Sequence, residues 1–318
     1  MLDISISCDG RDAPEAFVAR IDAGEAAGAA SVWIANHLFM RDPATLASVA
    51  LARTTAMRAV LMAVSPFTVH PVQIAMAAAT LDEFFPGRVS VCLGVGAPAD
   101  LKAIDREASK PLAAMREAID IMRALFGGET VTAENRTFSV RGRKLSAGRR
   151  DIPIILAASG PQMLELAGSC ADGVLISAGA CVEFVKWTLD SVHRGAKGRA
   201  VRSHGLVYAA VDEEETKAHD RLRHILANLL RGSHHAANLR MAGSVLDQKA
   251  LNQAILDGDW ARAEAFITDD IVRKHAASGS PELIRSRIEA YRAAGLDEIV
   301  ISGARDSDQI AGIIKAVS

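Results

Sequence analysis

Two turns rich in small and hydroxyl-bearing residues could hold an anion. The stretch IPIILAASGPQMLELAG (152–168) passes from a β-forming run through Ser159 and Gly160 into a helical pattern that begins with proline. The first N–H groups of a helix have no partner within the helix, so they attract anions. This turn could be an ordinary capped link, or it could hold a cofactor phosphate. A second such turn, at 177–180, favours the phosphate, because late strands of α/β barrels commonly build phosphate sites together.

Two earlier apolar runs also end in residues that could serve a site. Asn36 and His37 close the run SVWIAN, and histidine changes charge near neutral pH. His37 could therefore handle a proton or bind a ligand; a purely structural role is the alternative. Gly94 and Gly96, in LGVGAP, allow the backbone to approach a ligand closely. The segment lacks the third glycine of a dinucleotide fingerprint, so it does not indicate a Rossmann site.

The familiar hydrolytic and metal-binding patterns are missing from the sequence. There is no G-x-S-x-G elbow and no H-E-x-x-H, and His234 and His235 have no cysteine or carboxylate at ligand spacing. We therefore expect no metal site. A site rich in glycine, alanine and serine, with little converging charge, indicates that a bound cofactor carries the reaction while the protein supplies shape and orientation.

The elements that must position these residues alternate between strand and helix. Eight apolar strand-like runs are each followed by a helical pattern. They cover 2–8, 31–36, 58–64, 88–96, 152–158, 173–177, 204–212 and 298–303. Runs that are apolar on both faces are typical of a parallel sheet. The count predicts an α/β fold of the (β/α)8 TIM barrel type, with a doubly wound sheet as the alternative.

Two segments exceed a minimal barrel. Residues 127–151 are expected to form a surface hairpin or flap, and 226–280 a helical insertion after the seventh strand that covers the active site. No low-complexity linker interrupts the chain, so we expect one domain over 1–318.

Composition narrows the class of protein. Of the 318 residues, 50% are hydrophobic, and the net charge of −2 offers no basic excess for nucleic acid or a membrane surface. No apolar run is long enough to span a bilayer, and the start lacks the features of a signal peptide. The four cysteines form no CxxC pair, which is typical of buried thiols in the reducing cytoplasm.

Several motifs, in order along nearly the whole chain, carry a family likeness. The most specific are GRVSVCLGVG (87–96) and AASGPQMLELAGSCADGVL (157–175); AGAASVWIANH, SPFTVHP and SPELIRSRIEAYRAAGLDEIVISG accompany them. With these motifs the sequence resembles the bacterial luciferase-like superfamily of barrel oxidoreductases, and within it the methylenetetrahydromethanopterin reductase type. The resemblance implies coenzyme F420 or FMN at the barrel mouth, hydride transfer at its ring, a small-molecule substrate and a homodimer.

The resemblance also implies roles for individual residues. Asn36 and His37 would flank the ring and the substrate, with His37 the best candidate for proton handling. A bulge behind the ring, which in relatives often contains a non-proline cis peptide, would comprise Met62, Ala63, Val64 and Ser65. The cofactor tail would lie near Gly94 and Gly96, and its phosphate would be held by Ala158, Ser159, Gly160, Gly179 and Ala180.

One departure from the reductase pattern keeps alternatives open. Reductases of that type carry a carboxylate near the end of the first strand, where this sequence has Ser5, Ser7 and Asp9. Asp9 could substitute only if it faces the site. The main alternative is an FMN-dependent monooxygenase that uses reduced flavin and dioxygen. A separate flavin reductase would then supply the reduced flavin. A barrel that binds flavin without catalysis is a third.

Overall fold

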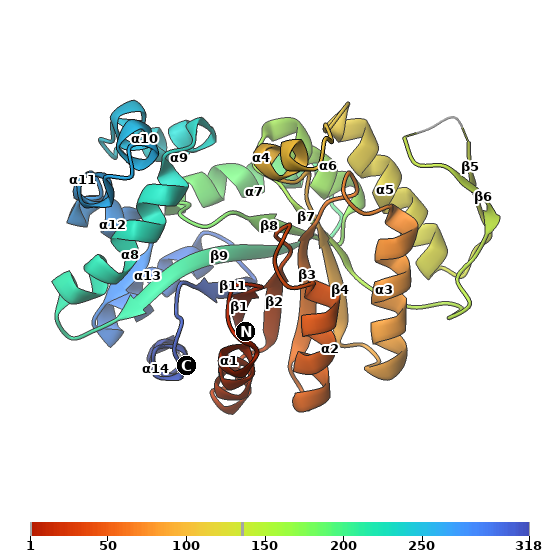
Figure 1. The fold of residues 1–318 in the computed structure, drawn as a ribbon, viewed down its shortest axis with the longest axis horizontal. Helices are drawn as coiled ribbons and strands as arrows, with labels where there is room; N and C mark the ends of the chain where they lie inside the picture. The colour runs from red at the N-terminus through yellow and green to blue at the C-terminus, as the bar shows by residue number, and fades with distance from the viewer. Residues whose placement is uncertain (1, 135–136, 318) are drawn as a thin grey trace.

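Eight parallel strands close into a barrel in the computed structural model, which describes residues 2–134 and 137–317 (Figure 1). The barrel strands are β1 (Asp3–Asp9), β2 (Ser31–Ala35), β3 (Arg58–Val64), β4 (Val89–Leu93), β7 (Ile154–Ala157), β8 (Gly173–Ile176), β9 (Arg202–Val211) and β11 (Glu298–Ser302). They pair in the order β9-β11-β1-β2-β3-β4-β7-β8, and a pairing between β8 and β9 completes the ring. The predicted TIM barrel is therefore confirmed, and the doubly wound sheet is excluded because an open sheet has no such closing pair.

The barrel strands are apolar on both faces because each face meets a separate core. Trp33, Val60, Met62, Cys92 and Val300 belong to the cluster inside the barrel. A larger cluster lies between the outer face of the strands and the surrounding helices. Burial of both faces explains why the strand sequences run continuously apolar instead of alternating.

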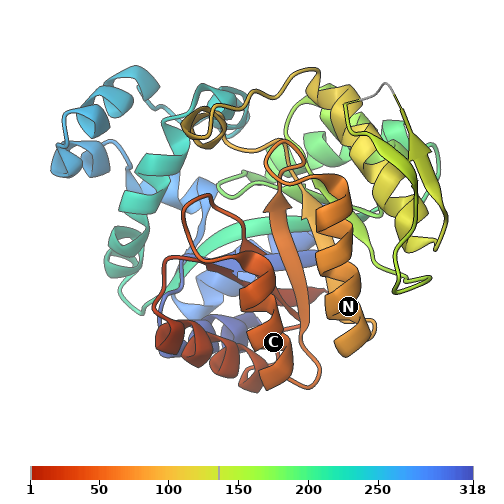
Figure 2. The same cartoon turned by 45° about the vertical axis from the view of Figure 1, so that its right-hand side comes forward.

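Helices follow the strands and cover the outside of the barrel (Figure 2). They are α1 (Pro14–Ala26), α2 (Pro43–Arg53), α3 (Pro71–Phe84), α4 (Pro98–Ala103), α5 (Pro111–Phe126), α6 (Pro161–Cys170), α7 (Val182–Ala196), α13 (Pro281–Ala293) and α14 (Ser307–Val317). Most begin with proline, whose fixed φ suits the first turn and whose missing N–H is not needed there. No helix within the described residues is long and apolar enough to cross a membrane.

The predicted flap at 127–151 contains an antiparallel hairpin. Its strands are β5 (Val131–Ala133) and β6 (Val140–Arg143), which stand beside α5 on the right of Figure 1. Residues 135 and 136, which belong to this predicted flap, lie outside the described residues.

The predicted helical insertion is broken into short helices with a small core of their own. The segment after β9 forms α8 (Glu215–Leu230), η1 (Ser233–His235), α9 (Ala236–Met241), α10 (Gln248–Leu256), α11 (Trp260–Ala265) and α12 (Asp269–His275). One part of the prediction is wrong: residues within 226–280 also form a strand, β10 (Ala277–Gly279), which pairs with β9. Three small residues carry no strand pattern, and their pairing with a distant edge appears only in the folded chain.

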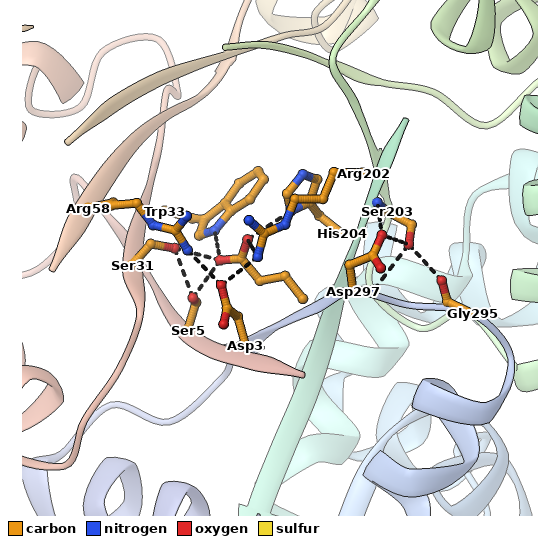
Figure 3. A network of polar contacts seen from close by, with 11 residues as sticks. Asp3, Ser5, Ser31, Trp33, Arg58, Arg202, Ser203, His204, Gly295 and Asp297 are labelled. Atoms are coloured by element: carbon orange, nitrogen blue, oxygen red, sulfur yellow. Dashed lines mark hydrogen bonds and ion pairs between the residues drawn. The ribbon is translucent and has the colours of Figure 1, made fainter. Parts of the chain in front are cut away.

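A buried polar network closes the end of the barrel where the strands begin (Figure 3). Glu298 Oε1 accepts hydrogen bonds from Ser5 Oγ (2.5 Å), Ser31 Oγ (2.6 Å) and Trp33 Nε1 (3.1 Å), and His204 Nδ1 lies 2.9 Å from Oε2. Burial disfavours the charge, but the bond and charge of His204 and the serine hydroxyls hold the pKa of Glu298 well below its usual range. This network joins four strands at their beginnings, away from the ends where a barrel carries its site.

Candidate active site

A cavity of about 830 Å³ opens at the carboxyl ends of the barrel strands. Residues in or directly after each of the eight barrel strands line it, together with residues from α8, η1 and α9 of the insertion. This volume is suited to a cofactor with a substrate beside it. A cavity therefore lies where the sequence predicts the site, and the insertion contributes to its wall.

Asn36 and His37 both line this cavity, directly after β2. The Asn36 N–H donates to the carbonyl of Met62 on β3, which fixes the backbone just before His37. The His37 side chain is half-buried, and no hydrogen bond from a described residue occupies its ring nitrogens. The ring is therefore available to a bound molecule.

The predicted bulge lies in β3, but only half of it reaches the cavity. The pairing of β3 with β4 shifts in register between Leu61 and Val64, and Met62 and Ala63 line the cavity. Val64 is instead buried in the core around the barrel, and Ser65 Oγ donates to the carbonyl of Val95 (2.7 Å). All peptide bonds in the described residues are trans, so the cis peptide implied by the resemblance is absent from this bulge.

The glycines after β4 form a surface that tolerates no side chain. A Cβ at Gly94 would lie 2.9 Å from the Cβ of Ala63, closer than carbon atoms approach one another. Gly96 has φ of 97°, a left-handed conformation that suits glycine, and a Cβ there would lie 3.1 Å from Ser65 Oγ. Both glycines line the cavity, as predicted, and leave a bare backbone cradle.

The turn after β7 is open towards the cavity. Ala158, Ser159 and Gly160 all line it, and Gly160 is the N-cap residue of α6. No side chain caps this helix, so the Ser159 hydroxyl is not used as a cap. The turn is therefore not the ordinary capped link that the sequence left as an alternative. The N–H groups that begin α6 stay open to a ligand.

The turn after β8 is arranged differently from the prediction. Ala180 lines the cavity, but Gly179 does not. Gly179 has φ of 74°, and its carbonyl points into the insertion, where it accepts from Asn238 Nδ2 and His275 Nδ1, each at 2.7 Å. Of this predicted pair, only Ala180 can face a ligand in the cavity.

With the site described, its relationship to known proteins can be stated. Residues 5–298 match the model of the luciferase-like monooxygenase family. The chain belongs to this family. A 5,10-methylenetetrahydromethanopterin reductase of Archaeoglobus fulgidus is 29% identical over 84% of this chain and 83% of its own length. An F420-dependent glucose-6-phosphate dehydrogenase of Beutenbergia cavernae is 34% identical over 56% of each chain.

Solved structures of other proteins share the fold. A coenzyme F420-dependent tetrahydromethanopterin reductase of Methanopyrus kandleri superposes with a TM-score of 0.90 at 23% identity, covering 98% of this chain and 97% of its own. An oxygenating component of 3,6-diketocamphane monooxygenase of Pseudomonas putida, in complex with FMN, gives 0.74 at 15% identity, with 100% and 96% covered. The named relatives are oxidoreductases, and this luciferase-like protein is assigned to the same enzyme class.

The first strand of this luciferase-like chain does bring carboxylates to the cavity. Asp9 lines it from the end of β1, which answers the question of its facing, while Ser5 belongs to the network at the opposite end. Asp12 also lines the cavity and forms an ion pair with Arg20, which itself donates to the Ser7 carbonyl (2.7 Å). Asp9 therefore lies at the cavity from the end of β1, as its predicted role as a substitute carboxylate requires.

Two buried titratable side chains in the wall of the cavity, Cys8 and His235, are uncharged near neutral pH. Burial raises the pKa of the Cys8 thiol to about 11, so Cys8 is a neutral wall residue and not a nucleophile. Burial, together with the nearby His234 and His275, lowers the pKa of His235 to about 4. His235 is 5% exposed, and its Nε2 has no partner among the described residues.

The sequence analysis predicted that the insertion covers the site, but it did not identify the residues that the insertion contributes. It considered His234 and His235 only as metal ligands, yet both line the cavity, as do Asn228 and Asn238. Among the described residues, no group of three or more His, Cys, Asp or Glu side chains could hold a metal ion. The adjacent pair of histidines could have marked these residues as candidates for the site, but the sequence does not show that they lie at the cavity.

Proposed function

We propose that this protein is an oxidoreductase that uses coenzyme F420 and moves a hydride between the deazaflavin and a small-molecule substrate. One observation carries the proposal: the glycine cradle after β4 and the two turns after β7 and β8 converge on a single cavity. The names of the relatives from Archaeoglobus fulgidus and Beutenbergia cavernae support a reaction of the methylenetetrahydromethanopterin reductase or F420-dependent dehydrogenase type.

The residues around the cavity fit a flat ring with a phosphate-bearing tail. A Cβ at Gly94 would collide with Ala63, so this position keeps a bare backbone at the cavity, which a flat group could approach closely. The uncapped start of α6 and the N–H of Ala180 offer donors to a phosphate. Met62 and Ala63 form an apolar backing in which a ring would be shielded from water.

The protein's own residues would position the reactants and handle the proton. When bound, the deazaflavin supplies the ring carbon that accepts or donates the hydride. His37, whose half-buried ring has no hydrogen-bond partner among the described residues, would hold or move a proton at the substrate, and Asn36 would orient the reacting group beside it. Asn228 and His235 from the insertion would close the substrate side and exclude water.

An FMN-dependent monooxygenase is the second candidate. The fold shared with the FMN-bound monooxygenase component of Pseudomonas putida favours it, because a ring and a ribityl phosphate are common to both coenzymes. In that case a separate flavin reductase would supply the reduced flavin.

The test is a fluorescence titration of the purified protein with coenzyme F420 and, separately, with FMN. We expect F420 to bind with a micromolar or tighter Kd and FMN to bind at least about tenfold more weakly, a difference of about 1.4 kcal/mol. Preferential binding of FMN, with oxygen consumption when reduced FMN is supplied, would favour the second candidate. Failure to bind either coenzyme would contradict both.

We also propose that the protein is a homodimer that works in the cytoplasm as one domain over 1–318. Exposed apolar side chains on the neighbouring helices α2 and α3 (Val49, Met76 and Phe84) give a face that a second copy could cover. The four cysteines are unpaired, which suits a reducing compartment. Sedimentation equilibrium tests the dimer: a monomer at micromolar concentration would contradict it.

A further inference from the structure

The turn after β8 is held by two buried side chains of the insertion. Asn238, in α9, is 1% exposed, and His275, at the end of α12, is 0% exposed. Both donate to the carbonyl of Gly179, each at 2.7 Å. A buried carbonyl that receives two side-chain donors has a firmly fixed direction, because losing either bond would cost free energy.

The protonation of His275 follows from its partners. A carbonyl oxygen can only accept a hydrogen bond, so Nδ1 of His275 must carry the proton that points to Gly179. On the other side of the ring, Nε2 lies 2.9 Å from Ser244 Oγ and accepts from that hydroxyl when the ring is neutral. Burial lowers the pKa of His275, so the ring is neutral at physiological pH and this tautomer is the one that fits.

Fixing the Gly179 carbonyl also fixes the N–H of Ala180. The two groups belong to one planar trans peptide and point in opposite directions. The carbonyl faces Asn238 and His275, of which His275 lies outside the cavity lining, while Ala180 lines the cavity together with Asn238. No hydrogen bond to an acceptor among the described residues is found for the Ala180 N–H. It therefore remains a donor at the cavity.

In the next peptide of the same turn, between Ala180 and Cys181, both polar groups are already hydrogen-bonded within the protein. The Ala180 carbonyl accepts from the buried Tyr291 hydroxyl (2.7 Å), and the Cys181 N–H donates to Asn238 Oδ1 (2.8 Å). Both ends of this peptide are used inside the protein. The turn thus contains two kinds of peptide. The Gly179–Ala180 peptide is open, because its N–H has no partner among the described residues, and the Ala180–Cys181 peptide is closed, because both its polar groups are bonded; buried side chains bond to each.

We propose that Asn238 and His275 are positioning residues of the coenzyme site: by holding the Gly179 carbonyl, they direct the Ala180 N–H at the coenzyme phosphate. This inference rests on the proposed function. It gives the insertion a second role besides covering the cavity, because α9 and α12 set the geometry of a turn that belongs to the barrel. Neither side chain needs to touch the coenzyme to act in this way.

The experiment compares coenzyme F420, which carries the phosphate and the tail attached to it, with a deazariboflavin that carries neither. The Kd of coenzyme F420 and the Kd of 8-hydroxy-5-deazariboflavin, which lacks the phosphate, are measured by fluorescence for each variant. His275→Leu and Asn238→Leu should each weaken F420 by about threefold to tenfold, and the double variant by about tenfold to hundredfold. The Kd of the phosphate-free ligand should change by less than about twofold, which is a difference of about 0.4 kcal/mol in binding free energy.

Two further variants separate positioning from general damage. His275→Asn should restore F420 binding to within about twofold, because its amide nitrogen lies as many bonds from Cα as Nδ1 does and can donate in its place. Tyr291→Phe removes one hydrogen bond from the same turn, but from the closed peptide, so both ligands should bind as they do to the unmodified protein.

The outcomes distinguish this inference from the function on which it rests. Equal weakening of both ligands in the His275→Leu and Asn238→Leu variants, or phosphate-selective weakening in Tyr291→Phe, would overturn the positioning role and leave the coenzyme assignment intact. An unmodified protein that binds neither ligand would overturn the coenzyme assignment itself. If His275→Leu does not fold, the comparison of Asn238→Leu, which removes one bond from each of the two peptides, with Tyr291→Phe, which removes one from the second peptide alone, decides the matter.

Discussion

Replacing Glu298 with glutamine should destabilise the barrel, although it hardly changes the shape of the side chain. The carboxylate is 3% exposed and accepts from Ser5, Ser31 and Trp33 on one oxygen and from His204 on the other. An ionised carboxylate only accepts hydrogen bonds, so every one of these four contacts has its donor on the partner. Glu298→Gln removes the charge and places an amide N–H₂ where one of the two oxygens was.

The size of the effect follows from these contacts. Hydrogen bonds to charged groups contribute about 1.5–3 kcal/mol each and neutral ones about 0.5–1.5 kcal/mol, so each retained bond weakens by about 1 kcal/mol. The glutamine can keep its oxygen towards Ser5, Ser31 and Trp33, while its amide faces His204. Release from the cost of a buried charge offsets part of the loss. We expect a net loss of about 2 kcal/mol in the free energy of unfolding at pH 7.

The effect should depend on pH in a defined direction. The pKa of Glu298 is lower in the folded protein than in the unfolded chain, where glutamate titrates near about 4.3. The stability that the carboxylate contributes is therefore fully present above pH of about 4.3 and is lost as the pH falls towards the folded pKa. The difference between the unmodified protein and Glu298→Gln should shrink steadily below that pH.

Urea denaturation followed by circular dichroism at pH 7, and at several lower values down to about pH 3.5, measures both effects. Glu289→Gln is a matched control, because Glu289 is exposed and, among the described residues, pairs only with the exposed Arg292, so its loss should change stability by less than about 0.5 kcal/mol. A Glu298→Gln protein as stable as the unmodified one at pH 7, or a difference that does not shrink in acid, would refute the reasoning.

Two further predictions concern the cavity. Ser159→Asp should weaken binding of F420 at least about tenfold in a fluorescence titration, because it sets a negative charge beside the phosphate at the start of α6; Ser159→Ala should bind normally, and unchanged affinity of the aspartate variant would remove this phosphate site. His37→Ala should lower turnover about 100-fold while changing the Kd of the coenzyme by less than about threefold, since a proton-handling group contributes about 10²–10⁴-fold to the rate. Stopped-flow reduction of F420 would measure that turnover, and an unimpaired His37→Ala rate would show that the histidine does not handle the proton.

The barrel could be predicted from the sequence because its signals are local. Each strand is a continuous apolar run that ends at a turn, and each run is followed by a helix that often begins with proline. Such patterns need only neighbouring residues, so the eight barrel strands and the hairpin were all identified. The short strand β10 was not, because Ala277–Gly279 has no pattern of its own and exists as a strand only through its pairing with β9.

The predicted site residues line the cavity where the prediction depended on strand ends, and do not line it where the prediction depended on the direction of a side chain or peptide. Asn36, His37, Gly94, Ser159 and other residues that close strands reached one cavity, because parallel strands bring their carboxyl ends together. Val64, Ser65 and Gly179 are next to residues that line the cavity, but they do not line it themselves. Val64 packs in the core, Ser65 bonds to the backbone after β4, and the Gly179 carbonyl faces the insertion. A sequence does not show which way a single peptide or side chain turns within a loop.

The amino-acid sequence by itself determined that this chain forms a barrel of parallel strands, because strands that are buried on both faces have continuously apolar sequences. It also indicated that the chemistry lies where those strands end. Only the tertiary structure decided how the insertion takes part. Asn238 and His275 meet the Gly179 carbonyl across 59 and 96 positions of the chain, respectively. Contacts over such separations depend on how packed elements bring distant backbone together, and no periodic pattern in the residues between them encodes that arrangement.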